Sequence, residues 1–126
     1  MPKKLLIVED EASMRGFYSR LFSCGPYSFT LAGSLAEAKG LMSKNSYDLL
    51  ITDMELGDGY GTELVDLANG TGGTKSIIIS GSYEPPELRA LAMNHGAHGY
   101  FSKPFDTEDL LKAVTGLLTA DAPTAQ

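Results

Sequence analysis

The chain has few of the residues that cross-link small proteins or bind soft metals. Its 126 residues contain one cysteine, Cys24, no tryptophan and two histidines. A single cysteine cannot form an intrachain disulfide, which is consistent with a reducing compartment. His95 and His98 flank a predicted turn with no cysteine or acid near them in the sequence, so we expect no metal site there.

Long apolar runs and basic residues are also scarce. No stretch approaches the roughly 18 apolar residues of a membrane helix, and the apolar run at residues 5–8 is too short for a signal peptide. Ten Lys and Arg stand against sixteen Asp and Glu, which gives a net charge of −6. Because phosphate backbones attract basic surfaces, an acidic domain is a poor match for nucleic acid. We expect a cytoplasmic domain without direct nucleic-acid or membrane binding.

The remaining composition suits one globular domain. The chain is 43% hydrophobic and 21% charged, and it is long enough to bury a core. No change in composition divides it, so residues 1–119 are predicted to form one domain. Residues 120–126 are small and polar, and they are predicted to be a tail or the start of a linker.

Short apolar runs alternate along the chain with longer segments of helical periodicity. Because the runs lack polar alternation, they favour strands buried on both faces. Strands are predicted at residues 5–8, 29–32, 48–52, 76–80 and 99–101. Helices are predicted at residues 12–23, 35–44, 60–68, 87–94 and 107–118. Five βα repeats with right-handed crossovers predict an α/β fold with one parallel sheet and helices on both faces.

The ends of the predicted helices carry local signals. Ser34 and Glu37 form the pattern of a capping box, and Asp106 is expected to cap the last helix. A glycine-rich segment at residues 69–73 is expected to end the third helix at residue 68.

Charged side chains follow three of the predicted strands. Glu9 and Asp10 end the first strand, Asp53 ends the third and Lys103 follows the fifth. The carboxyl ends of parallel strands meet at one edge of a sheet, where α/β folds bind ligands. Three carboxylates in one pocket repel one another, and a divalent cation removes that conflict. Ligands that are all oxygen favour a hard ion such as Mg²⁺.

Two further groups at this edge indicate phosphate chemistry. Lys103 places a point charge on a long stem, which suits a phosphoryl oxygen. Ser80 ends the fourth predicted strand and supplies a hydroxyl, although it could also be a plain strand cap. A carboxylate, a metal, a lysine and a hydroxyl together indicate phosphoryl transfer onto the carboxylate.

Four motifs at the strand ends match a known family in order and spacing. They are, in chain order, Val8-Glu9-Asp10-Glu11, Leu50-Ile51-Thr52-Asp53-Met54, Ile79-Ser80-Gly81 and Ser102-Lys103-Pro104-Phe105. The chain resembles the receiver domain of two-component response regulators from about residue 3 to residue 118. The resemblance implies a flavodoxin-like, doubly wound sheet of five parallel strands in the order 2-1-3-4-5 with five helices.

The resemblance also implies roles for the residues at the strand ends. Asp53 is the phosphoacceptor. Asp10 and Asp53 ligate Mg²⁺ directly, the backbone carbonyl of Glu55 is a third ligand, and Glu9 acts through a water.

Three more residues have implied roles in reading the modification. Ser80 hydrogen-bonds the phosphoryl group and relays the switch, and Tyr100 stands at the aromatic switch position. Lys103 binds a phosphoryl oxygen, or pairs with Asp53 when Asp53 is unmodified. The peptide bond before Pro104 is typically cis in this family and directs Lys103 into the site. As a plain strand aromatic, Tyr100 would need no such role.

The implied partners follow from this chemistry. A sensor histidine kinase or a histidine phosphotransfer protein donates the phosphoryl group, and an unknown output protein or domain reads a face at residues 87–118. The domain is not a turnover enzyme, since it promotes only its own phosphorylation and dephosphorylation. The last helix lacks an arginine-rich continuation, which favours a monomer in the unphosphorylated state and a free-standing protein over a severed domain.

Two alternatives and one departure remain open at this point. A phosphorylation-independent interaction module would keep the fold, but the intact Asp10, Asp53 and Lys103 argue against it. A haloacid-type phosphatase would need a second Asp where Glu55 stands. Gly57 replaces a proline common in receivers and predicts a looser loop after Asp53.

Overall fold

Five parallel strands form the centre of the fold, and the computed structural model describes residues 2–81 and 85–119. The strands are β1 (Lys4–Val8), β2 (Ser28–Ala32), β3 (Leu49–Asp53), β6 (Lys75–Ser80) and β7 (Gly99–Ser102). Their order is β2-β1-β3-β6-β7, with every neighbouring pair parallel. Counted within this sheet, the order is the predicted 2-1-3-4-5.

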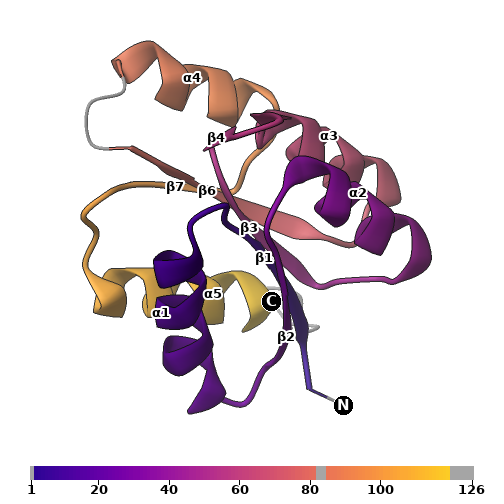
Figure 1. Cartoon of the computed structure of the whole chain (residues 1–126), viewed down its shortest axis with the longest axis vertical. Coiled ribbons are helices and arrows are strands. Elements are labelled where there is room, and N and C mark those ends of the chain that lie inside the picture. The colour runs from indigo at the N-terminus through magenta and orange to yellow at the C-terminus, as the bar shows by residue number, and fades with distance from the viewer. Residues whose placement is uncertain (1, 82–84, 120–126) are drawn as a thin grey trace, which may run out of the picture.

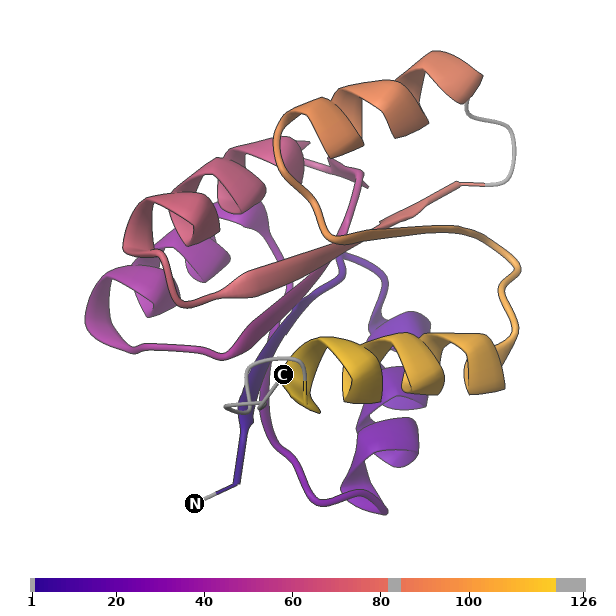
Figure 2. The same cartoon turned by 180° about the vertical axis from the view of Figure 1, so that it is seen from behind.

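Helices cover both faces of the sheet (Figures 1 and 2). One face carries α1 (Ala12–Ser23) and α5 (Thr107–Thr119). The other face carries α2 (Leu35–Lys44), α3 (Thr62–Thr71) and α4 (Pro86–Asn94). Five helices on two faces confirm the predicted doubly wound fold. Within the described ranges, no helix has the length and apolar character needed to span a bilayer.

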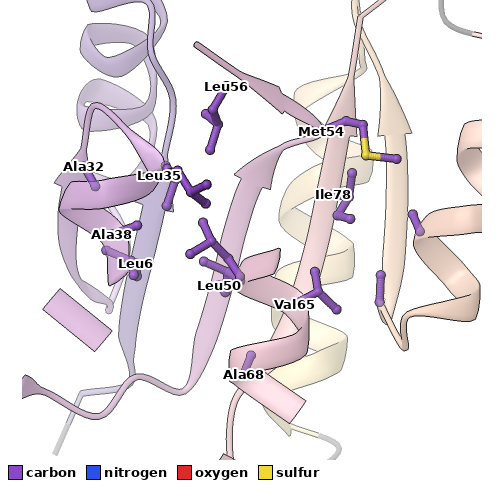
Figure 3. Close-up of a cluster of buried hydrophobic side chains, with 14 of the residues drawn as sticks. Leu6, Ala32, Leu35, Ala38, Leu50, Met54, Leu56, Val65, Ala68 and Ile78 are labelled. Atoms are coloured by element: carbon purple, nitrogen blue, oxygen red, sulfur yellow. The ribbon is translucent and has the colours of Figure 1, made fainter. Parts of the chain in front are cut away.

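The central strands are buried on both sides, as their unbroken apolar runs predict. Successive side chains of a strand point to opposite faces. In β1, Leu5 and Ile7 therefore join the cluster under α1 and α5, while Leu6 and Val8 join the cluster under α2, α3 and α4. Figure 3 shows the second cluster, where side chains of the sheet meet those of α2 and α3.

The segment after β3 differs from the prediction at both ends of its helix. Helix α3 begins at Thr62 rather than Tyr60, because Gly59–Tyr60 forms a short strand, β5, paired antiparallel with β4 (Glu55–Leu56). The predicted end at residue 68 was wrong, and the helix continues to Thr71. It ends where Gly72 adopts a left-handed φ of +78°, which favours glycine.

The predicted caps are present, with one change. The Ser34 hydroxyl accepts a hydrogen bond from the Glu37 backbone N–H at 3.0 Å. The Glu37 carboxylate accepts in turn from the N–H of Gly33 at 2.7 Å, one residue earlier than a standard capping box. Asp106 accepts from the N–H of Glu108 at 2.8 Å and caps α5. The predicted tail, residues 120–126, lies outside the described residues.

Candidate functional site

Three carboxylates meet at the carboxyl-terminal edge of the sheet. One oxygen each of Glu9, Asp10 and Asp53 lies within 4.8 Å of the others. The parallel pairing of β1 and β3 sets Val8 beside Thr52, so the residues that follow are neighbours. Strand alternation then directs Glu9 and Asp53 toward the face of α1 and α5. The strand register therefore brings together Glu9 and Asp53, which are 44 positions apart in the sequence.

Lys103 reaches this group from the end of β7. Its Nζ lies 3.1 Å from Glu9 Oε1, 3.1 Å from Asp53 Oδ1 and 3.3 Å from Asp53 Oδ2. Its backbone N–H donates to the carbonyl of Ser80 at 2.9 Å, which holds the end of β7 against β6. The peptide bond between Lys103 and Pro104 is cis, as the family resemblance implies.

The charges in this cluster do not balance. Glu9 is 1% exposed and Asp53 is 8% exposed, so both carboxylates are buried beside a single ammonium. Burial and the Glu9 charge raise the pKa of Asp53 to about 7, against the opposing effect of Lys103. Burial alone would lower the pKa of Lys103, but Asp53 and Glu9 outweigh it and raise that pKa. The pKa of Asp53 rises because two acids are buried together, and the pKa of Lys103 rises because both acids lie beside it.

Glu9 and Asp10 differ in their surroundings. Glu9 Oε1 accepts from Lys103, and Glu9 Oε2 accepts from the N–H of Glu11 at 3.1 Å. Asp10 is exposed on the rim, beside an open pocket of about 490 Å³ that Asp10 shares with residues of β4 and β5. Glu9 is therefore fixed by the protein, whereas Asp10 faces the pocket.

The donor set fits a hard divalent cation. Asp53 Oδ1 is buried and accepts no hydrogen bond from residues 2–81 or 85–119, although Lys103 lies close to it. A buried carboxylate oxygen in that position is suited to a metal ligand. Every candidate ligand is an oxygen, which favours Mg²⁺ over softer ions. Glu55, the expected carbonyl ligand, lies on β4 at the wall of the same pocket.

Ser80 ends β6, and Tyr100 lies on the neighbouring strand β7. Ser80 is 1% exposed, and its Oγ is 3.4 Å from Ser102 Oγ and 3.5 Å from the carbonyl of Gly81. Tyr100 is half-buried against the cluster under α4, and its ring centroid is 5.5 Å from Cζ of Arg89. This cation–π contact links β7 to α4. The hydroxyl of Ser80 thus contacts Ser102 of β7 and the carbonyl of Gly81.

Tyr18 lies near the carboxylates Glu9 and Asp53, and the sequence predicted no role for it. It lies on α1, is 1% exposed and packs with Phe105, two residues after Lys103. Its hydroxyl has no hydrogen-bond partner in the described part of the chain. Burial and the charges of Glu9 and Asp53 raise its pKa. The signal in the sequence that could have indicated Tyr18 was a hydroxyl group on the buried face of the predicted helix.

His95 has an acidic neighbour that is distant in the sequence. His95 Nδ1 lies 2.8 Å from Asp66 Oδ1, so an acid does stand beside it. Asp66 comes from α3, 29 positions earlier, and sequence proximity could not indicate it.

Comparison with known proteins identifies the family of this chain. Residues 5–115 match the model of the response regulator receiver domain. The chain belongs to this family. A receiver domain is a component of two-component signalling with a histidine kinase as partner, and it is not a conventional enzyme. Receiver domains typically bind Mg²⁺ in an acidic pocket, and this receiver has the acidic triad.

Curated relatives of this receiver include longer proteins. It is 29% identical over 123 residues to the response regulator MprA of Mycobacterium sp. strain KMS, a match covering 98% of this chain and 54% of the relative. The MprA of Mycobacterium tuberculosis strain H37Rv is 28% identical, with the same coverage. The chain thus spans about half the length of the curated relatives it matches.

Solved structures are similar along nearly their whole length. A CheY-like receiver domain protein from Methanospirillum hungatei JF-1 has a TM-score of 0.88 and 26% identity, covering 95% of this chain and 96% of that one. The chemotaxis response regulator CheY4 of Vibrio cholerae has a TM-score of 0.82 and 26% identity, covering 94% and 100%.

Proposed function

We propose that this receiver accepts a phosphoryl group on Asp53 from the phosphohistidine of a sensor histidine kinase or a histidine phosphotransfer protein. The observation that supports this best is the buried Asp53 carboxylate, with one oxygen that lacks a hydrogen bond and a lysine 3.1 Å away. A structural ion pair would have no need of two more acids within 4.8 Å.

The transfer forms one bond and breaks one. An oxygen of ionised Asp53 attacks the phosphorus as the phosphorus–nitrogen bond of the phosphohistidine breaks, and the imidazole nitrogen keeps the electron pair. Asp10, Asp53 and the backbone carbonyl of Glu55 would hold Mg²⁺, which neutralises charge on the phosphoryl oxygens, with Glu9 acting through a water. Lys103 supplies a second positive charge to those oxygens.

The modification changes which partner Ser80 prefers. Its hydroxyl exchanges the 3.4 Å contact with Ser102 for a phosphoryl oxygen, and Tyr100 moves with the adjacent segment. The face formed by α4, β7 and α5 then presents a different surface to an output protein or domain. Phosphorylation acts only through its different affinities for the two conformations.

Several wider features are part of the same proposal. Residues 1–119 form the receiver, residues 120–126 form a tail or the start of a linker, and the unphosphorylated domain is a monomer in the cytoplasm. The receiver promotes its own phosphorylation and dephosphorylation only.

A test uses a small phosphodonor and the whole chain. With acetyl phosphate and Mg²⁺, mass spectrometry should show one added phosphoryl group, absent when Mg²⁺ is chelated and absent in Asp53→Asn. Asp109→Asn changes an exposed acid on α5 and is the matched control, which should be phosphorylated like the wild type. Incorporation that persists in Asp53→Asn would contradict the assignment. No incorporation in any variant would favour the phosphorylation-independent interaction module.

A further inference from the structure

The hairpin of β4 and β5 carries the proposed carbonyl ligand but is too short to be stable by itself. Each strand has two residues, with Glu55 paired to Tyr60 and Leu56 paired to Gly59. An isolated hairpin of even ordinary length is marginally stable in water. The position of the Glu55 backbone must therefore depend on contacts outside the hairpin.

Asp58, at the turn of the hairpin, makes such a contact with α2. Its Oδ1 accepts from the N–H of Leu35 at 2.9 Å, and its Oδ2 accepts from the N–H of Ala36 at 3.0 Å. These are first-turn N–H groups that have no partner inside the helix. The two hydrogen bonds lower the pKa of Asp58, so the carboxylate is ionised at the positive end of the helix dipole.

Apolar packing reinforces this bidentate contact. Leu56 is 4% exposed and belongs to the cluster that contains Leu35 and Ala38 of α2. Figure 3 shows Leu56 above Leu35 on the α2 side of the sheet. Gly59 passes so close that a Cβ there would collide with the Leu35 side chain.

The other side of the hairpin is tied to the site. The N–H of Gly61 donates to the carbonyl of Met54 at 2.8 Å, directly after Asp53. A Cβ on Gly57 would lie 3.9 Å from Asp10 Oδ2. The hairpin therefore lies between the acidic cluster and the start of α2. The looser loop expected at Gly57 was inferred from the freedom of glycine alone, without these contacts.

We propose that Asp58 is a positioning residue for the magnesium site. By clamping the hairpin to the first turn of α2, it fixes the Glu55 carbonyl relative to Asp10 and Asp53. Asp58 touches neither the cation nor the phosphoryl group in this role. The inference rests on the proposed function, because it takes the Glu55 carbonyl as a ligand. Groups that orient metal ligands from the next shell commonly set metal affinity.

The chain offers a matched control for the test. Ser34 caps the same helix by accepting a hydrogen bond from the N–H of Glu37 at 3.0 Å, and its hydroxyl is not hydrogen-bonded to the hairpin. Ser34→Ala and Asp58→Ala each remove a cap of α2, so both should weaken that helix. Only Asp58→Ala should also release the hairpin.

The experiment measures the Mg²⁺ dissociation constant of the unphosphorylated 126-residue chain by following backbone amide shifts in a magnesium titration. Asp58→Ala is expected to weaken Mg²⁺ binding about ten-fold, the low end for outer-shell partners, while Ser34→Ala retains the wild-type value. Asp58→Asn, which keeps one acceptor oxygen, should fall between them. Without magnesium, amide hydrogen exchange across residues 55–60 should speed up in Asp58→Ala and not in Ser34→Ala.

Two results would overturn the inference. One is an Mg²⁺ affinity that Asp58→Ala leaves unaltered, and the other is an equal loss in Asp58→Ala and Ser34→Ala. A wild-type chain that does not bind magnesium would instead overturn the proposed function itself, so the two failures are distinguishable.

Discussion

Replacing Gly61 by alanine is expected to lower the free energy of unfolding by about 3 kcal/mol, the upper range for an overpacked site. Gly61 has φ −62° and ψ −20°, angles that any residue adopts, so backbone strain is not the cause. The cause is space: a Cβ at Gly61 would collide with the backbone carbonyl oxygen of Asp53 and lie 2.8 Å from Thr52 Oγ1. The backbone of the phosphoacceptor has to shift to relieve the clash.

Urea unfolding measures the loss of stability in Gly61→Ala, and Gly40→Ala is the control variant. Gly40 lies inside α2, where a Cβ would meet nothing within 4 Å. Alanine there should raise stability by about 0.5 to 1 kcal/mol, because it removes the entropy cost of glycine in a helix. If Gly61→Ala were as stable as the wild type, the close approach at Asp53 would not constrain the site.

Removing the acceptor charge should stabilise the metal-free protein at neutral and higher pH. Burial and Glu9 raise the pKa of Asp53 from 3.8 to about 7, so the ionised group is disfavoured in the folded state. Asp53→Asn removes that charge and leaves Lys103 with Glu9 as its partner, 3.1 Å away. The free energy of unfolding is expected to rise by on the order of 2 kcal/mol at about pH 8. This is less than the full shift of the Asp53 pKa would give, because the asparagine variant also loses the ion pair with Lys103.

The sign of the pH dependence follows from proton binding. Between pH 3.8 and about 7, the folded state holds a proton on Asp53 that the unfolded state has released. The stability of the wild type therefore falls as pH rises through this window, and the penalty is complete above it. The advantage of Asp53→Asn should grow from near zero at about pH 4 to its maximum at about pH 8.

Urea unfolding at several pH values, with a chelator present, checks this prediction. Added Mg²⁺ should reduce the difference in free energy of unfolding between Asp53→Asn and the wild type, because it stabilises the wild-type protein and not the asparagine variant. Asp109→Asn, which changes an exposed acid, should show no such rise. A difference between Asp53→Asn and wild type that is independent of pH would contradict the assigned cause.

The fold and the acidic edge were predictable because their determinants are local. The strands are short, largely apolar runs, and charged residues end or follow three of them, so Glu9, Asp10 and Asp53 could be assigned to one edge from parallel topology alone. Helix boundaries were less predictable where two signals competed. In α3, the first glycine of the run at residue 70 is tolerated inside the helix, and the left-handed Gly72 ends it.

The sequence by itself determined the α/β class, the strand order implied by the family motifs and the set of groups at the strand ends. Only the tertiary structure decided how those groups share charge, with one Lys103 between two buried carboxylates. It alone showed that Tyr18 lies near these carboxylates and that Asp58 accepts hydrogen bonds from the first turn of α2. The physical reason is range: periodicity and caps act over a few residues, whereas desolvation and hydrogen bonding depend on neighbours brought together by packing across the chain.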